Sequence, residues 1–295
     1  MSLHVIDPRP RAAGNAPGSP SGPRAALGVV DELRQRAKLE NFPVASRFLD
    51  SEVRQHLMAL YGYARLVDEA GDAGFGDRER LLDGIAEQLG MLFDGRAPDD
   101  PVIAALAPTV AAAGLPREPF LALIEANRRD QRIVRYETFE DLIGYCELSA
   151  NPVGELVLRL FHSLTPQTKE WSDRICSGLQ LVEHWQDIAE DMEAGRVYVP
   201  QEDLRRFGVF EFELEGDEAS EPFRKMMAFE VARARSMLEE GLPLIGELTG
   251  EARLAVAAYL AGGLAALDAL EAAHYDVLGA RPKASVPARA AETLK

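Results

Sequence analysis

Apolar side chains recur every three or four residues along most of the chain, which is the spacing of a helix with one buried face. The first such stripe contains Leu57, Leu60, Tyr61, Ala64, Val67 and Asp68. The same period predicts further helices over residues 81–93, 101–113, 117–129, 139–146, 152–164, 167–192, 221–242 and 252–278. Turn residues separate them, as in "DGRAPDD" at 94–100 and "EAGRVYVP" at 193–200. The pattern therefore predicts a helical protein.

Alternating runs of β-branched residues are missing, and no GxGxxG motif follows a strand pattern, which argues against a dinucleotide-binding fold. No linker inside residues 25–280 is long enough to separate domains, and no repeat of fixed period is found. We therefore predict one all-α domain of roughly ten helices over residues 25–280.

The ends of the chain differ from this domain. Residues 1–24 are rich in Pro, Gly and Ala without the apolar core of a signal peptide, so we predict a disordered N-terminal tail. Residues 281–295 form a predicted C-terminal tail, whose Arg281 and Lys283 are either plain basic residues or diphosphate contacts. The longest apolar run, 254–267, is shorter than the ~20 residues of a spanning helix, so any membrane contact is expected to be peripheral.

The charge balance restricts the partners. With 32 basic and 48 acidic residues the net charge is −16, which argues against a nucleic-acid binder. An acidic protein can still bind an anionic substrate when divalent cations bridge the two. The only two cysteines, Cys146 and Cys176, are too few for a disulfide framework. We therefore predict a cytoplasmic protein, with peripheral association at the inner face of the membrane left open.

Two helical stretches carry paired aspartates, in "YGYARLVDEAGD" at 61–72 and "GLQLVEHWQDIAEDMEAGRVYVP" at 178–200. Because residues four and seven apart share a helix face, each stretch presents one polar stripe. The first stripe consists of Tyr61, Arg65, Asp68 and Asp72, and the second of Gln180, Glu183, Asp187 and Asp191.

A chain this acidic also carries acidic pairs at that spacing by chance, mostly on solvated faces. Like charges four residues apart repel unless a cation lies between them, which favours a metal site where two such pairs occur on apolar helices. Hard oxygen ligands point to Mg²⁺, which takes carboxylates together with phosphate oxygens and water. His184 adjoins the second stripe and is more typical of a packed or hydrogen-bonded residue than of a ligand.

These residues resemble the squalene and phytoene synthases, which join or convert prenyl diphosphates head to head. Tyr61, Arg65, Asp68 and Asp72 match the family's first motif, Y-x-x-x-R-x-x-D-[DE]-x-x-D, and Asp187 and Asp191 followed by "GRVYVP" match its second. The resemblance covers about residues 40–281. It implies the isoprenoid synthase fold around a central cavity and two or three Mg²⁺ ions held by the four aspartates. Tyr61, Arg65, Arg196 and Tyr198 would then bind the substrate.

Within this family, three segments are similar to the hopanoid-pathway branch that makes hydroxysqualene from presqualene diphosphate. They are "ENFPVASRFL" at 40–49, "YCELSANPVGELVLRLF" at 145–161 and "HWQDIAEDMEAGRVYVP" at 184–200. Condensing members commonly carry Arg where Gln186 stands, so the pocket here would lack one cation. The family usually has Asn where Glu183 stands, and Glu183 either ligates Mg²⁺ or turns away while water replaces it.

Other residues keep two interpretations each. The resemblance places Tyr145 and Asn151 in the pocket at a helix break, as candidates to hold the water that captures a carbocation. Phe42, Tyr63 and Phe161 are either core or walls of a prenyl channel. Arg47 makes either a diphosphate contact or a surface ion pair.

The expected activity is Mg²⁺-dependent conversion of presqualene diphosphate to hydroxysqualene, without a nicotinamide cofactor. One alternative is condensation of two farnesyl diphosphates to presqualene diphosphate or a carotenoid precursor. The other is a helical assembly factor that has lost the chemistry. Handover of lipid to other squalene-pathway enzymes is an open expectation.

Overall fold

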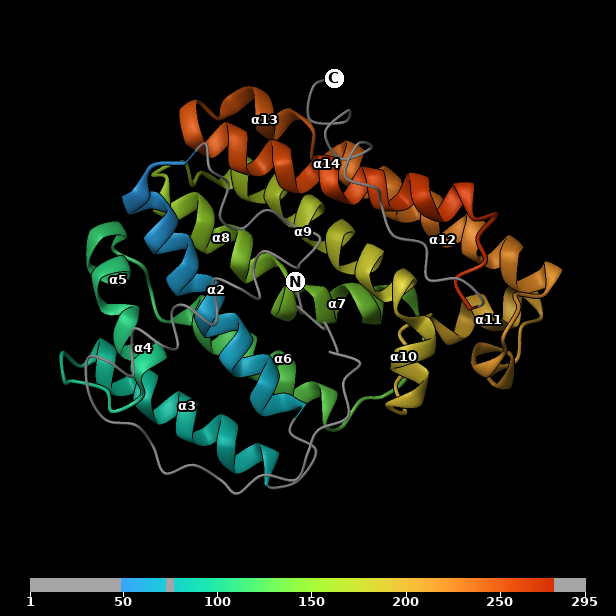
Figure 1. The fold of residues 1–295 in the computed structure, drawn as a ribbon, viewed down its shortest axis with the longest axis horizontal. Coiled ribbons are helices and arrows are strands. Elements are labelled where there is room, and N and C mark those ends of the chain that lie inside the picture. The colour runs from blue at the N-terminus through green and yellow to red at the C-terminus, as the bar shows by residue number, and fades with distance from the viewer. Residues whose placement is uncertain (1–48, 73–76, 279–295) are drawn as a thin grey trace. The chain divides into compact units, whose positions relative to one another are not determined.

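The computed structural model describes residues 49–72 and 77–278 (Figure 1). Within these ranges the regular structure is helical, with one isolated bridge between Arg135 and Val197 and no strand. The prediction of an all-α protein is therefore confirmed. The described residues fall into two compact units, one ending at Gly114 and the other beginning at Leu115. The predicted limits of a single domain stay a prediction.

The described part of the N-terminal unit contains four helices. These are α2 (Ser51–Gly71), α3 (Arg78–Phe93), α4 (Pro101–Ala105) and α5 (Ala107–Ala113). The other three pack on α2, whose buried face carries Leu57, Leu60 and Val67. Aspartate side chains cap the first turns of α3 and α4, since Asp77 accepts from Arg80 N–H and Asp100 accepts from Val102 and Ile103 N–H.

The C-terminal unit begins with five helices. They are α6 (Glu118–Asp130), α7 (Phe139–Ser149), α8 (Asn151–Leu160), α9 (Pro166–Gln186) and α10 (Ile188–Glu193). Capping boxes start α7 and α9: Thr138 pairs with Asp141, and Thr165 with Thr168. The described part of the unit continues with α11 (Gln201–Phe207), the short 3₁₀ helix η1 (Glu211–Glu215), α12 (Glu221–Glu240), α13 (Pro243–Glu247) and α14 (Gly250–Ala272).

Helix α9 is the centre of this unit. It contacts α7, α8, α10, α12, α13 and α14, and Figure 1 shows α8 beside it. Gly263 on α14 allows close approach, because a Cβ there would lie 2.4 Å from Cδ2 of Leu179 on α9. The small residues of the 254–267 run therefore serve tight helix packing.

Two predicted helices are interrupted. The segment 167–192 breaks at Asp187, whose φ of −109° and ψ of 17° separate α9 from α10. The segment 101–113 breaks at Leu106, two residues before Pro108, which lacks an N–H and whose ring would clash with a preceding carbonyl. The sequence pattern also missed α11, η1 and α13, which are too short to show a full apolar period.

Helix α14 is longer than its apolar run. By length and composition alone its 23 residues could cross a membrane, although 56% of the most apolar window is buried inside the protein. A buried core helix has the same properties, so peripheral membrane contact stays a prediction. Cys146 and Cys176 are free thiols, and burial raises the pKa of Cys146 to about 12.

Candidate functional site

The first aspartate motif lies in the last three turns of α2. Tyr61 and Asp68 are buried, the latter with 7% of its surface exposed. Arg65 is mostly buried, and its Nη2 lies 3.5 Å from Oε1 of Glu69. Asp72 follows the last helical residue, is exposed, and donates its backbone N–H to the Asp68 carbonyl over 2.9 Å. A carboxylate buried on an apolar helix face needs a cation or a hydrogen-bond donor to compensate its charge, so Asp68 is a candidate metal ligand.

The second motif lies at the junction of α9 and α10. Although the helix breaks at Asp187, the four-residue relation persists, since Asp187 N–H donates to Glu183 O (3.0 Å) and Asp191 N–H to Asp187 O (2.8 Å). Asp191 is 6% exposed, and Oε2 of Glu183 is buried. Gln186, the last residue of α9, is half-buried. Glu183, Asp187 and Asp191 therefore place three carboxylates, four residues apart, at the junction of α9 and α10.

The segment after α10 is held by backbone hydrogen bonds. Arg196 N–H donates to Asp191 O (2.8 Å), and Val197 N–H donates to Val134 O (2.9 Å). Gly195, at φ 80°, makes the turn that a residue with a side chain would adopt only with strain. These bonds fix the position of Tyr198, which is buried.

Four residues that are distant in sequence meet beside this motif, and we call Asp130, Tyr136, Tyr145 and Tyr198 the tyrosine cluster. The Tyr145 hydroxyl donates to Oδ2 of Asp130 over 2.6 Å, and the Tyr198 hydroxyl donates to Oδ1 over 3.3 Å. The Tyr136 ring centroid lies 5.6 Å from that of Tyr145 and 5.8 Å from that of Tyr198. Tyr145 and Tyr198 are predicted site residues, whereas Asp130 and Tyr136 belong to no motif and were not predicted.

The three phenols are neutral. Burial first, and the Asp130 carboxylate second, raise the pKa of Tyr136, Tyr145 and Tyr198 well above its ordinary value. Each phenol therefore keeps its proton and acts as a hydrogen-bond donor. The cluster offers neutral polar groups around a single carboxylate.

His184 joins the tyrosine cluster to the second motif. Its ring stacks on Tyr198 with centroids 3.7 Å apart, and its Nδ1 lies 3.9 Å from Oδ2 of Asp191. Its Nε2 is 3.2 Å from Nε2 of Gln180. His184 is thus a buried, packed and hydrogen-bonded residue, as the sequence indicated.

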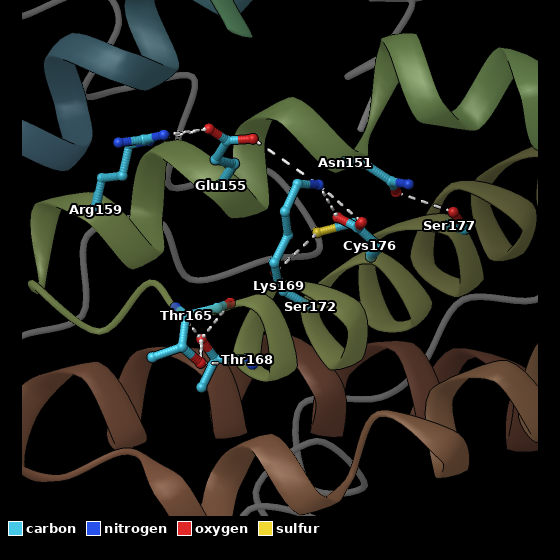
Figure 2. Close-up of polar contacts among 10 residues, drawn as sticks. Asn151, Glu155, Arg159, Thr165, Thr168, Lys169, Ser172, Cys176 and Ser177 are labelled. Carbon is cyan, nitrogen blue, oxygen red and sulfur yellow. Dashed lines mark hydrogen bonds and ion pairs between the residues drawn. The ribbon is translucent and has the colours of Figure 1, made fainter. Parts of the chain in front are cut away.

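Asn151, the other candidate to hold water, begins α8 and faces α9. Its Oδ1 accepts a hydrogen bond of 2.9 Å from the Ser177 hydroxyl in a buried contact (Figure 2). Gly154 lies one turn further, and a Cβ there would come within 2.6 Å of Cys176 Sγ. Asn151 therefore links two closely packed helices, whereas Tyr145 belongs to the tyrosine cluster.

The remaining predicted residues are placed as follows. Tyr63 is 1% exposed and is a core residue of the N-terminal unit. Phe161 is half-buried at the end of α8. Phe42, Arg47, Arg281 and Lys283 lie outside the described residues.

The carboxylates fit Mg²⁺ by their chemistry. Among the described residues no three His, Cys, Asp or Glu side chains converge as a preformed metal cluster. Mg²⁺ does not need one, since it is commonly held by one or two carboxylates and completes its six ligands with substrate phosphates and water. The buried Asp68 and Asp191 offer oxygen donors of that kind. Magnesium binding itself stays a prediction.

Comparison with known proteins agrees with the motifs. The squalene/phytoene synthase family model matches residues 35–289. A hydroxysqualene synthase from Zymomonas mobilis is 32% identical over 203 residues, covering 68% of each chain. A 15-cis-phytoene synthase from Synechococcus elongatus is 31% identical over 288 residues, covering 91% of this chain and 92% of that one.

The fold agrees as well. The crystal structure of squalene synthase HpnC from Alicyclobacillus acidocaldarius matches with a TM-score of 0.77 at 39% identity, covering 86% of this chain and 97% of that one. The isoprenoid synthase fold implied by the resemblance is therefore confirmed. The family match over most of the chain, with both aspartate motifs in order, shows that this protein belongs to the squalene/phytoene synthase family.

Proposed function

We propose that this protein converts presqualene diphosphate to hydroxysqualene, with release of diphosphate and capture of the resulting carbocation by water. The observation that carries the proposal is the tyrosine cluster. Neutral phenols adjoin the second aspartate motif through Tyr198, His184 and Asp191. Neutral polar groups can hold a water molecule, and they do not trap the cation as an anionic nucleophile would.

The chain's own residues have separate roles in this reaction. Asp68, Asp72, Asp187 and Asp191 would hold Mg²⁺, with Glu183 as a further candidate, and the metal supplies Lewis-acid stabilisation of the departing diphosphate. Arg65 and Arg196 are the candidate cations to neutralise charge on diphosphate. The apolar side chains of the helices would exclude bulk water while the cation rearranges.

Gln186 supports a pocket for one diphosphate. It ends α9 directly before Asp187, at the position where condensing members commonly carry Arg. A neutral amide there leaves one cation fewer for a second diphosphate. The similarity to a hydroxysqualene synthase points the same way, although the phytoene synthase relative, at similar identity, makes condensation the competing activity.

The competing activities are separated by their substrates. Purified protein with Mg²⁺ is given either presqualene diphosphate or farnesyl diphosphate, without any reductant, and the extracted lipids are identified by mass spectrometry. The proposal predicts an alcohol from presqualene diphosphate and little product from farnesyl diphosphate. Efficient formation of presqualene diphosphate or a carotenoid precursor would assign the protein to the condensing branch, and no turnover of either substrate would favour an assembly role.

A further inference from the structure

The Tyr136 hydroxyl is a buried group with no hydrogen-bonding partner among the described residues. The side chain is only 1% exposed. Buried hydroxyls nearly always have a protein or water partner, because an unsatisfied one loses its hydrogen bonds to water without replacement. A small polar molecule bound in the tyrosine cluster would supply that partner.

The neighbouring phenols offer the complementary group. Tyr145 and Tyr198 each use their only proton on Asp130, so their oxygen lone pairs remain as acceptors. Tyr136 can donate and Tyr145 can accept. A donor and an acceptor on adjacent rings are what a single water molecule requires.

Asp130 is the anion of the tyrosine cluster. Its 2.6 Å hydrogen bond from Tyr145 has the length of a charge-assisted bond between a hydroxyl and a carboxylate. The phenols are neutral and hold their protons tightly, so none of them can serve as the final base. Asp130 lies one hydroxyl away from any molecule that binds to Tyr145.

We propose that Asp130 is a positioning residue that, through Tyr145, accepts the proton released when water captures the carbocation, while Tyr136 donates a hydrogen bond to that water. The inference rests on the proposed function. A water lone pair forms the new C–O bond, one water O–H bond breaks, and that proton passes to the Tyr145 oxygen as Tyr145 gives its own proton to Asp130. The products are a neutral alcohol and a protonated Asp130, which later returns the proton to solvent. No oxidant or reductant takes part.

The test separates ionisation from capture. Wild type, Asp130→Asn, Tyr145→Phe and the double variant are given presqualene diphosphate and Mg²⁺, and both diphosphate release and the alcohol share of the lipid product are measured. Asparagine can still accept a phenol hydrogen bond but cannot take up a proton. We expect Asp130→Asn to keep diphosphate release within about threefold while the alcohol share falls at least about tenfold in favour of elimination products.

The double variant shows whether the two residues act together. If Asp130 works through Tyr145, the double variant should be no worse than Tyr145→Phe alone, because interacting residues are not additive. Asp130→Glu, which restores a carboxylate, should recover part of the alcohol share. Asp173→Asn is the matched control, since Asp173 is an acid on α9 that pairs with Lys169 outside the site and should leave the share unchanged.

Two outcomes would overturn the inference. One is an unchanged alcohol share in Asp130→Asn when wild type makes the alcohol. The other is a fall of diphosphate release as large as the fall of the alcohol share, which would indicate a purely structural role for Asp130. If Asp130→Asn does not fold, the same two quantities are compared in Asp130→Glu. Absence of alcohol from wild type would instead refute the proposed function itself.

Discussion

Two carboxylates meet where α11 packs on α12, and they make the stability of the C-terminal unit depend on pH. Asp203 is 2% exposed and Glu230 is fully buried. Nη1 of Arg233 lies 3.0 Å from Asp203 Oδ2 and 3.3 Å from Glu230 Oε2, so one guanidinium serves both acids. Cζ of Arg233 lies 3.9 Å from the centroid of the Phe139 ring, in a cation–π contact. Arg206 adds only an exposed guanidinium, whose Nη1 lies 3.9 Å from Asp203 Oδ1, so the charge of the two buried acids is compensated in part, which favours a proton on one of them.

The size of the pH effect on the free energy of unfolding follows from the pKa of Glu230. Burial, opposed by Arg233 and reinforced by Asp203, raises the pKa of Glu230 to about 8 from an ordinary 4.5. Between these values the folded protein holds a proton that the unfolded chain has lost, so the free energy of unfolding falls as pH rises, by about 1.4 kcal/mol per pH unit. The stabilisation is complete below pH 4.5 and is lost as pH rises through 8, a change on the order of 5 kcal/mol.

Glu230→Gln removes the titration while keeping the length of the side chain. Relative to wild type, the variant should gain about 3 kcal/mol in the free energy of unfolding between pH 5 and pH 8. Urea unfolding followed by tryptophan fluorescence measures this in the relevant unit, because both tryptophans, Trp171 and Trp185, lie on α9. Glu239→Gln, at an exposed site on the same helix, should follow wild type. If the free energy of unfolding changes with pH by the same amount in wild type and in Glu230→Gln, the reasoning is refuted.

Further predictions concern the metal, the packing and the tail. Asp68→Asn and Asp187→Asn should each keep the circular dichroism spectrum but lose at least about a hundredfold in diphosphate release, and full activity in both would refute metal binding there. Gly263→Ala should lower the melting temperature, because the added Cβ overpacks against Leu179 at a cost of about 1–3 kcal/mol. At Gly84 an added Cβ meets no atom within 4 Å, so Gly84→Ala should stabilise α3 by about 0.5–1 kcal/mol. Deleting residues 1–24 should change neither melting temperature nor activity, and a fall of several degrees would show that the tail docks.

The fold was largely predictable because its long helices carry a full apolar period and local start signals. Helix α12 illustrates this, since its predicted range 221–242 differs from the observed Glu221–Glu240 only at the end. The break at Asp187 was not predictable, because the apolar pattern continues from α9 into α10 while the backbone turns. Short elements such as α13 depend on tertiary contacts with α9 and α14 rather than on their own sequence.

The site divides in the same way. Asp68 and Asp72, like Asp187 and Asp191, are four residues apart, so their relation is local and a sequence motif can show it. Asp130 is different, because it meets Tyr145 and Tyr198 across 15 and 68 residues. Only folding brings α6, α7 and the segment after α10 together, and the spacing of apolar and polar residues along the sequence does not predict such a long-range contact.

The central claim is that water captures a carbocation formed from presqualene diphosphate. The direct measurement is a reaction with purified protein, Mg²⁺ and presqualene diphosphate in oxygen-18 water, without a reductant, followed by mass spectrometry of the extracted lipid. The account predicts hydroxysqualene that is heavier by two mass units, with oxygen taken from solvent. An unlabelled alcohol, or no alcohol while diphosphate is released, would contradict it.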